Sequence, residues 1–157
     1  MNKLNAIYLD MDGTIANTYG VENWLAMLHR EETTPYEIAE PLCDMCALRE
    51  IMRTARENGI IIGVISWGSK GADIAYNRRI KKAKIDWLRR MNILDEIDEI
   101  HVVKYGTPKH KTAKIPFSIL VDDDDNVRDA WEDFGGLTIN PKELDILETL
   151  AELIKED

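Results

Sequence analysis

The chain has 157 residues, a formal net charge of −9, and contents of 45% hydrophobic and 31% charged residues. These values are ordinary for a soluble globular protein, and the length suits one domain with a hydrophobic core. The negative charge argues against general affinity for nucleic acid, and no apolar run is long enough to span a membrane. Residues 1–5 lead straight into a predicted strand without room for a signal peptide. We therefore expect a cytoplasmic protein that forms no stable complex with nucleic acid or membrane.

Strand and helix patterns alternate along the chain. Short apolar runs predict five strands, at about residues 5–10, 60–66, 99–104, 118–122 and 137–139. Helical patterns cover residues 46–57, 72–91 and 125–134, and a last helix is expected to begin at Asn140-Pro141 and to bury Leu144. This alternation predicts an α/β fold of the Rossmann-like kind, with a mostly parallel five-stranded sheet and helices on both faces.

The segment between the first strand and the first long helix is short. Residues 16–45 hold only brief helical patterns, such as residues 21–30. We therefore expect a single domain over residues 1–157 with a small lid inserted at about 16–45. Cys43 and Cys46 lie near the end of this segment without a second cysteine pair, so we expect two reduced thiols.

Basic residues are concentrated in one predicted helix. Residues 70–90 carry eight basic and two acidic side chains, a local net charge of +6, so the rest of the chain carries −15. The simpler interpretation is the solvated face of a helix. The alternative is a surface that attracts an anionic substrate.

Two carboxylates follow the first predicted strand, in the segment Asp10-Met11-Asp12-Gly13-Thr14. Strand residues two positions apart point to the same side, so Asp10 and Asp12 are expected side by side. Gly13 allows a sharp turn directly after the second acid. In such a pair, one carboxylate can attack an electrophile or bind a metal while the other transfers a proton. A solvated turn is the plain alternative.

Polar residues also follow the other predicted strands. Ser66 ends the second strand, a lysine-rich loop at 104–114 follows the third, and Asp122 and Asp123 follow the fourth. Ligands of parallel α/β sheets bind in the crevice at the carboxyl ends of the strands. We therefore expect two acid pairs, a hydroxyl and at least one lysine in a single crevice.

In these segments the chain resembles the haloacid dehalogenase-like (HAD) hydrolase superfamily over nearly its whole length. The resemblance is carried by Asp10-Met11-Asp12-Gly13-Thr14, by Ser66 and by Ile119-Leu120-Val121-Asp122-Asp123. It implies that Asp10 attacks a phosphoryl group and that Asp12 first gives and then takes a proton. It also implies that Ser66 and one lysine bind the phosphoryl oxygens. Lys109 and Lys111 are the candidates, and Pro108 favours Lys109 because it can fix the turn before it.

The resemblance implies a bound Mg²⁺ as well. Its expected ligands are Asp10, the main-chain carbonyl of Asp12 and Asp122, with Asp123 contributing directly or through water. Clustered carboxylates beside an anionic phosphate need such a cation, and oxygen ligands suit Mg²⁺.

The small lid and the double acid at Asp122-Asp123 look similar to 5′(3′)-deoxyribonucleotidases and to polynucleotide phosphatase modules. A phosphorylated small molecule, a nucleotide or a polynucleotide end is the substrate that this resemblance implies. Three alternatives stay open: a broad sugar-phosphate phosphatase, a phosphotransferase, and a non-catalytic binding protein of the same fold. Trp67 and Trp24 are candidates for stacking on a base, with plain packing as the alternative. The residues expected to contact substrate are Gly13, Thr14, Trp67 and Asn126.

Overall fold

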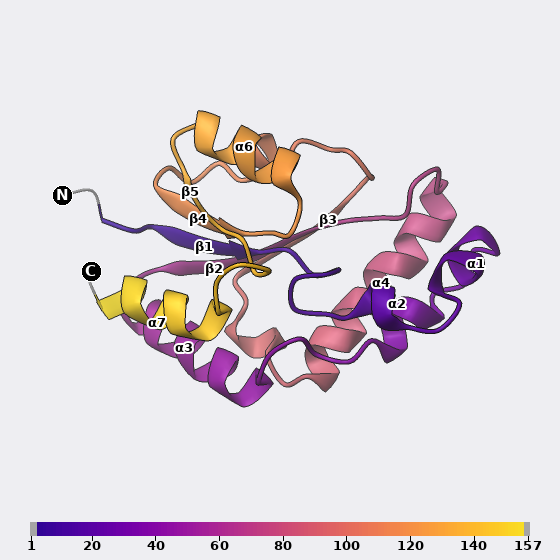
Figure 1. Ribbon diagram of the computed structural model, residues 1–157, viewed down its shortest axis with the longest axis horizontal. Coiled ribbons are helices and arrows are strands. Elements are labelled where there is room, and N and C mark those ends of the chain that lie inside the picture. Colours follow the sequence, from indigo (N-terminus) through magenta and orange to yellow (C-terminus); the bar gives the residue numbers. More distant parts are fainter. Residues whose placement is uncertain (1–2, 156–157) are drawn as a thin grey trace.

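The computed structural model describes residues 3–155 and confirms the predicted sheet (Figure 1). All strand pairs are parallel, and the strand order is β3-β2-β1-β4-β5. The central strand β1 pairs with β2 on one side and with β4 on the other, so the carboxyl ends of these three strands lie side by side. The strands are Ala6–Leu9 (β1), Ile61–Trp67 (β2), Glu99–Val103 (β3), Ser118–Val121 (β4) and Leu137–Ile139 (β5).

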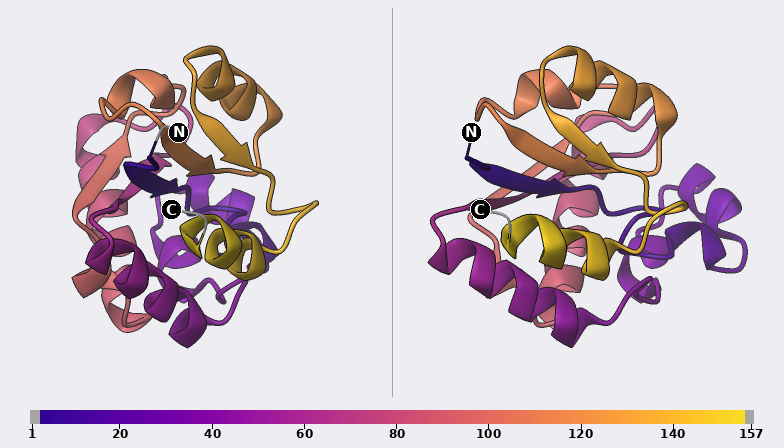
Figure 2. Two further views of the ribbon diagram at one scale, coloured as in Figure 1. Left: turned by 90° about the vertical axis from the view of Figure 1, so that its left-hand side faces the viewer. Right: turned by 60° about the vertical axis from the view of Figure 1, so that its left-hand side comes forward.

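Helices cover both faces of this sheet, as expected (Figures 1 and 2). One face is covered by Met45–Glu57 (α3), Ile74–Arg90 (α4) and Ile146–Lys155 (α7), and the other by Lys109–Thr112 (α5) and Asp125–Asp133 (α6). Within residues 3–155, none of the helices combines the length and the apolar composition that crossing a membrane requires.

The alternation of side chains along β1 builds a core on each face of the sheet. Ile7 and Leu9 join the larger core, where they pack with residues of α3, α4 and α7. Tyr8 points the other way, to Trp131 of α6, and the two rings meet edge to face at 5.7 Å. A strand buried on both faces is therefore apolar throughout, which explains the unbroken apolar runs in the sequence.

The segment between β1 and α3 forms short helices that pack beside α4 (Figure 1). Four main-chain carbonyls of this segment accept hydrogen bonds from α4 side chains: Glu31 from Arg79, Glu32 from Tyr76, Glu37 from Arg90, and Ala39 from Trp87. The inserted segment is thus attached to α4 by polar contacts as well as by packing. Its elements are Thr18–Gly20 (η1), Trp24–His29 (α1) and Thr34–Ile38 (α2).

The predicted start of the last helix at Asn140-Pro141 is wrong. Helix α7 begins at Ile146, and the Asp145 carboxylate accepts a hydrogen bond from the Glu148 N–H at 2.8 Å. The Asn140 side chain instead accepts from the N–H of Lys142, which makes a local turn of a kind that Asn favours. Leu144 lies in the intervening loop and is 50% exposed, not buried.

Candidate active site

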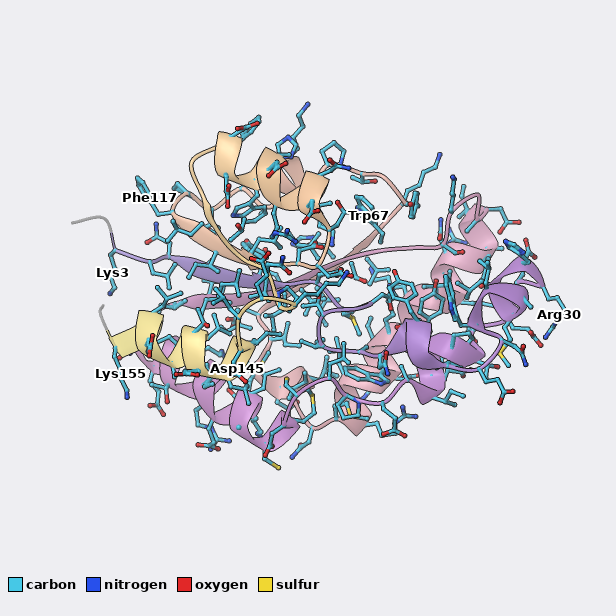
Figure 3. All side chains as sticks on the ribbon, viewed as in Figure 1. Lys3, Arg30, Trp67, Phe117, Asp145 and Lys155 are labelled. Carbon is cyan, nitrogen blue, oxygen red and sulfur yellow. The ribbon has the colours of Figure 1, made fainter. Side chains whose placement is uncertain are left out.

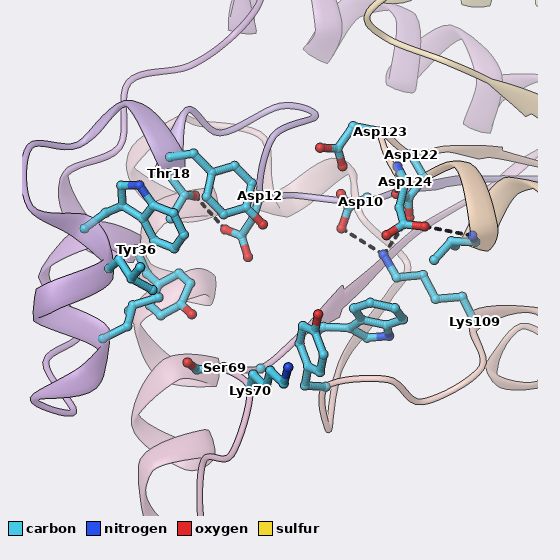
Figure 4. A pocket seen from close by; sticks show the side chains of 18 of the residues that line it. Asp10, Asp12, Thr18, Tyr36, Ser69, Lys70, Lys109, Asp122, Asp123 and Asp124 are labelled. Carbon is cyan, nitrogen blue, oxygen red and sulfur yellow. Dashed lines mark hydrogen bonds and ion pairs between the residues drawn. The ribbon is translucent and has the colours of Figure 1, made fainter.

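The carboxyl ends of the strands open into one cavity of about 680 Å³ (Figure 4). In Figure 3, Trp67 lies toward this end of the sheet, whereas Lys3, Phe117 and Lys155 lie at the opposite end. The wall combines the β1 turn, the inserted segment and the loops after β2, β3 and β4. It includes Asp10, Asp12, Thr18, Tyr19, Trp24, Tyr36, Trp67, Lys70, Tyr105, Lys109, Asp122, Asp123 and Asn126.

The sheet and a tight turn place the first acid pair. The Asp10 N–H donates to the Val121 carbonyl at 2.9 Å, which continues the β1–β4 ladder and brings Asp10 beside Asp122. Gly13 has a φ of +78°, and a Cβ at this position would lie 2.4 Å from Asp123 Oδ2. Gly13 therefore permits both the turn and the close approach of Asp123.

Two of the residues expected to contact substrate lie behind Asp10 rather than on the cavity wall. The Thr14 hydroxyl is buried and donates to Asp10 Oδ2 at 3.0 Å. Gly13 is the turn residue described above and does not line the cavity. Both residues shape the surroundings of Asp10 in this structure. The geometry therefore does not favour a direct contact of Gly13 or Thr14 with a substrate.

A buried lysine joins the two acid pairs. Lys109 Nζ lies 2.8 Å from Asp10 Oδ1 and 2.7 Å from Asp122 Oδ2, and its side chain is almost wholly buried (Figure 4). Pro108 is the residue directly before α5 and has an extended conformation, and Lys109 is the first residue of the helix. Lys111 is exposed and does not line the cavity, because residues two positions apart on a helix point in different directions. The structure thus brings Lys109, and not Lys111, to the acidic residues.

Three carboxylates cluster around this lysine. Asp10, Asp122 and Asp123 each offer an oxygen, and these oxygens lie within 4.8 Å of one another. Burial, followed by the negative charge of Asp10, raises the pKa of Asp122 to about 6 and that of Asp123 to about 7. Burial alone would lower the pKa of Lys109, but Asp10 and Asp122 outweigh it and raise that pKa.

This set of donors fits a Mg²⁺ ion. The single ammonium group of Lys109 cannot balance three carboxylates. Burial raises the pKa values of Asp122 and Asp123 most, and the negative charge of Asp10 raises them further. Hard oxygen ligands at this density are what Mg²⁺ and similar cations prefer. The carboxylate of Asp12 is not part of the cluster.

Asp12 has surroundings of its own. Its Oδ1 accepts from the Thr18 hydroxyl at 2.6 Å, and its Oδ2 accepts from Lys84 Nζ at 2.7 Å. Figure 4 shows Asp12 beside Thr18, apart from the group formed by Asp10, Lys109 and Asp122. Two carboxylates only two positions apart in the sequence therefore differ in their partners, which allows them different chemical roles.

Lys84 is one of the basic residues at 70–90, a run that the sequence presents as the solvated face of a helix. The surface interpretation of that run is correct for exposed residues such as Lys81 and Lys82, but it is wrong for Lys84, which is 1% exposed. A signal was present, since position 84 falls on the same stripe of α4 as Ile80 and Trp87. A lysine within an apolar stripe predicts a buried, paired ammonium group.

Ser66 does not reach the cavity wall. Its side chain has no exposed area, and its Oγ accepts from Lys84 Nζ at 2.6 Å. The sequence predicted a direct contact between Ser66 and a phosphoryl group. In this structure, the contact of the Ser66 hydroxyl is with the lysine that holds Asp12.

Aromatic side chains form two parts of the wall. The rings of Trp67 and Tyr105 lie 5.0 Å apart, and those of Tyr19 and Trp24 lie 4.9 Å apart. Trp67 also donates to the Thr107 carbonyl at 2.9 Å. Burial and then the charge of Asp12 raise the pKa of the Tyr19 hydroxyl, so it stays protonated. The cavity therefore offers flat apolar surfaces near its acidic end.

Asn126 is exposed at the cavity wall. In the described part of the chain, its side chain makes no hydrogen bond to Asp10 or to Lys109. Its neighbour Asp124 caps α6 by accepting from the Val127 N–H at 3.0 Å. Asn126 therefore lies on the cavity wall without being a partner of the acidic cluster, and its contact with substrate stays a prediction.

No protein-family model matches this sequence, and no curated protein matches it. Solved structures do match in fold. The N-terminal part of the protein BF1531 from Bacteroides fragilis, which contains a phosphatase domain complexed with Mg, matches with TM-score 0.57 and 18% identity over 96% of this chain. This chain spans only 40% of that one.

Two further structures match over most of both chains. The haloacid dehalogenase-like hydrolase SP0104 from Streptococcus pneumoniae has TM-score 0.56 and 9% identity, covering 87% of this chain and 84% of its own. The D,D-heptose 1,7-bisphosphate phosphatase from Burkholderia thailandensis matches with TM-score 0.51 and 16% identity. The match covers 84% of this chain and 74% of the phosphatase chain. At these identities the matches establish a shared fold.

Replacing Gly13 by Ala tests whether the close approach of Asp123 requires glycine. Gly71 is a matched control because its φ of +75° is similar while nothing lies within 4 Å of a Cβ there. We expect Gly71→Ala to lower the free energy of unfolding by about 1–2 kcal/mol through backbone strain alone. Gly13→Ala should cost about 1–3 kcal/mol more, because Asp123 must move. Urea unfolding of both variants measures the difference, and equal losses would contradict the assigned contact.

Binding of Mg²⁺ is expected to depend on pH. In the folded chain, Asp122 and Asp123 have pKa values of about 6 and 7. Above pH ~4, where these carboxyl groups are deprotonated in the unfolded chain, the folded chain therefore binds more protons than the unfolded chain. The metal-free protein therefore loses stability as the pH rises from ~4 to ~7. At pH 8 the cation enters a deprotonated site, whereas at pH 5 it must displace protons. We expect Mg²⁺ to raise the Tm more at pH 8 than at pH 5.

Thermal unfolding with Mg²⁺ and with a chelator, at both pH values, measures this difference. Asp123→Asn should reduce the Tm shift at pH 8. Asp129→Asn, an exposed carboxylate on α6, should leave it unchanged. A shift of the same size at pH 5 and pH 8 would rule out these carboxylates as the metal site.

Proposed function

We propose that this chain, which has the fold of the haloacid dehalogenase-like hydrolases, is a Mg²⁺-dependent phosphomonoester hydrolase that acts through an aspartyl-phosphate on Asp10. The observation that carries the proposal is the separation of two neighbouring carboxylates. Asp10 lies among acidic residues beside Lys109, whereas Asp12 is held by Thr18 and Lys84. This arrangement suits a nucleophile and a separate general acid–base.

In the first step, an oxygen of the Asp10 carboxylate forms a bond to phosphorus while the bond from phosphorus to the leaving oxygen breaks. Asp12 gives its proton to that leaving oxygen, so that a neutral alcohol departs. Lys109 lies within hydrogen-bond distance of Asp10 and donates to the phosphoryl oxygens, where negative charge develops.

In the second step, Asp12 takes a proton from water as the water oxygen attacks phosphorus. The bond between phosphorus and Asp10 breaks, which releases inorganic phosphate, restores the Asp10 carboxylate and leaves Asp12 protonated for the next cycle. The residues that would hold Mg²⁺ are Asp10, the main-chain carbonyl of Asp12, Asp122 and Asp123. When bound, Mg²⁺ supplies positive charge that attracts and polarises the phosphoryl group.

For the substrate, we propose a nucleotide or the phosphorylated end of a polynucleotide. The support is the pair of aromatic walls, Trp67 with Tyr105 and Tyr19 with Trp24, because a base can stack on such rings. The second pair belongs to the inserted segment at about residues 16–45, which we propose as a small lid in a single-domain protein. The cationic side chain of Lys70, at the wall beside Trp67, adds attraction for an anionic ligand.

The reaction is tested by release of inorganic phosphate from nucleoside monophosphates, from oligonucleotides with a 5′ or 3′ phosphate, and from sugar phosphates, each with Mg²⁺ and with a chelator. Asp10→Asn should lower the rate by about 1,000-fold or more, because the nucleophile is lost. Asp129→Asn should keep the full rate. Wild-type release that persists in chelator, or Asp10→Asn turnover equal to wild type, would refute the proposed mechanism.

Base stacking is tested by Tyr105→Ala. Tyr105 is half exposed on the cavity wall and meets the ring of Trp67, so its loss removes stacking surface with little effect on the core. We expect the KM for nucleoside monophosphates to rise about tenfold and the KM for sugar phosphates to stay near its wild-type value. Phe134→Ala, an exposed aromatic outside this cavity, is the control. An equal rise in KM for both substrate classes would argue against a base on this wall.

A further inference from the structure

Lys84 is a buried ammonium group with a complete set of partners. Its Nζ donates to Asp12 Oδ2 at 2.7 Å, to Ser66 Oγ at 2.6 Å and to the Trp67 carbonyl at 2.7 Å. An ammonium group has three donors and no acceptor, so these three contacts use all its hydrogens. Burying a lone charge costs several kcal/mol, and here Asp12 is the carboxylate that offsets it.

The exposures of the two partners separate their roles. The Lys84 side chain is 1% exposed and does not line the cavity, whereas the Asp12 side chain is 15% exposed and does. A bound substrate can therefore touch Asp12 but not Lys84. Any influence of Lys84 on the reaction must pass through Asp12.

Each oxygen of Asp12 is held by a donor from a different element of the fold. Thr18 of the inserted segment holds Oδ1, and Lys84 of α4 holds Oδ2. The ring of Tyr36, also from the inserted segment, lies 4.8 Å from Lys84 Nζ and limits its movement. A carboxylate whose two oxygens are both hydrogen-bonded keeps one orientation. Proton transfer to or from a defined substrate atom requires such a fixed orientation.

We infer that Lys84 is a positioning residue for Asp12, and that Ser66 acts on the reaction by anchoring Lys84. This inference rests on the proposed function, in which Asp12 transfers the protons. Ser66 Oγ can only accept from the ammonium group, so the contact ties the end of β2 to α4. Helix α4 thereby takes part in the chemistry although none of its residues lies on the cavity wall.

The test compares Lys84→Met with Lys82→Met, using p-nitrophenyl phosphate in the presence of Mg²⁺. Methionine keeps most of the length of lysine without its charge, and Lys82 is an exposed lysine of the same helix that pairs with Asp86. We expect Lys84→Met to lower kcat by about 100-fold and to lower KM with it, so that kcat/KM stays near the wild-type value, and Lys82→Met to match the wild type.

A positioning role for Lys84 can be told apart from a merely structural role by the amount of aspartyl-phosphate present during turnover. The p-nitrophenolate group departs without a proton, so Lys84→Met should still form the aspartyl-phosphate. Attack of water needs a well-placed Asp12, so the intermediate should accumulate, as a burst of p-nitrophenol and a mass increase of one phosphoryl group. A generally damaged site would slow formation as well and would show neither sign.

Two further variants keep the inference open to refutation if Lys84→Met does not fold. Ser66→Ala retains the ammonium group but removes one anchor, and should lower kcat about tenfold with the same accumulation. In an Asp12→Asn background, Lys84→Met or Ser66→Ala should cause no additional loss of kcat. A wild-type rate in Lys84→Met or Ser66→Ala, or losses that add to that of Asp12→Asn, would overturn the inference alone. No phosphate release by the wild-type protein would overturn the proposed function together with it.

Discussion

The interaction on which the site depends is the contact of Lys109 with Asp10 and Asp122. These carboxylates come from the ends of adjacent parallel strands, and their separation is set by the β1–β4 ladder. Brought this close and buried with Asp123, they would repel one another without a cation between them. One ammonium group offsets part of that repulsion and leaves a residual negative charge. Burial, and after it the charge of Asp10, raises the pKa values of Asp122 and Asp123. The same residual negative charge makes the cluster suited to a divalent cation.

The second organising feature is that two different helices supply the lysines that bind Asp10 and Asp12. On one side, α5 supplies Lys109 to the acidic cluster. On the other, α4 supplies Lys84 to Asp12, and the inserted segment supplies Thr18. Each lysine is buried and paired with carboxylates, so the two acids of the first motif are kept in different orientations. Proposed nucleophile and proposed acid–base thus owe their difference to helices that follow different strands.

The inserted segment links the aromatic wall of the cavity to Asp12, the proposed acid–base residue. It carries Tyr19 and Trp24 on the cavity wall and Thr18 on Asp12, while its carbonyls are bound by α4. A movement of this segment would therefore alter the aromatic wall and the hydrogen bond to Asp12 together. The shared fold with larger phosphatase structures does not decide what this surface binds, because function depends on such site details.

By itself, the sequence determined the strand order along the chain, the parallel sheet and the acidic residues at its carboxyl end, because apolar periodicity and local turn chemistry carry that information. It also pointed to Lys109 through Pro108. It misplaced the start of α7, where a local Asn140 turn competed with a helix. Only the tertiary structure decided that Lys84 faces Asp12 and that Ser66 is turned away from the cavity. Those contacts join residues far apart in the chain, and burial of a lysine depends on a partner that no local pattern specifies.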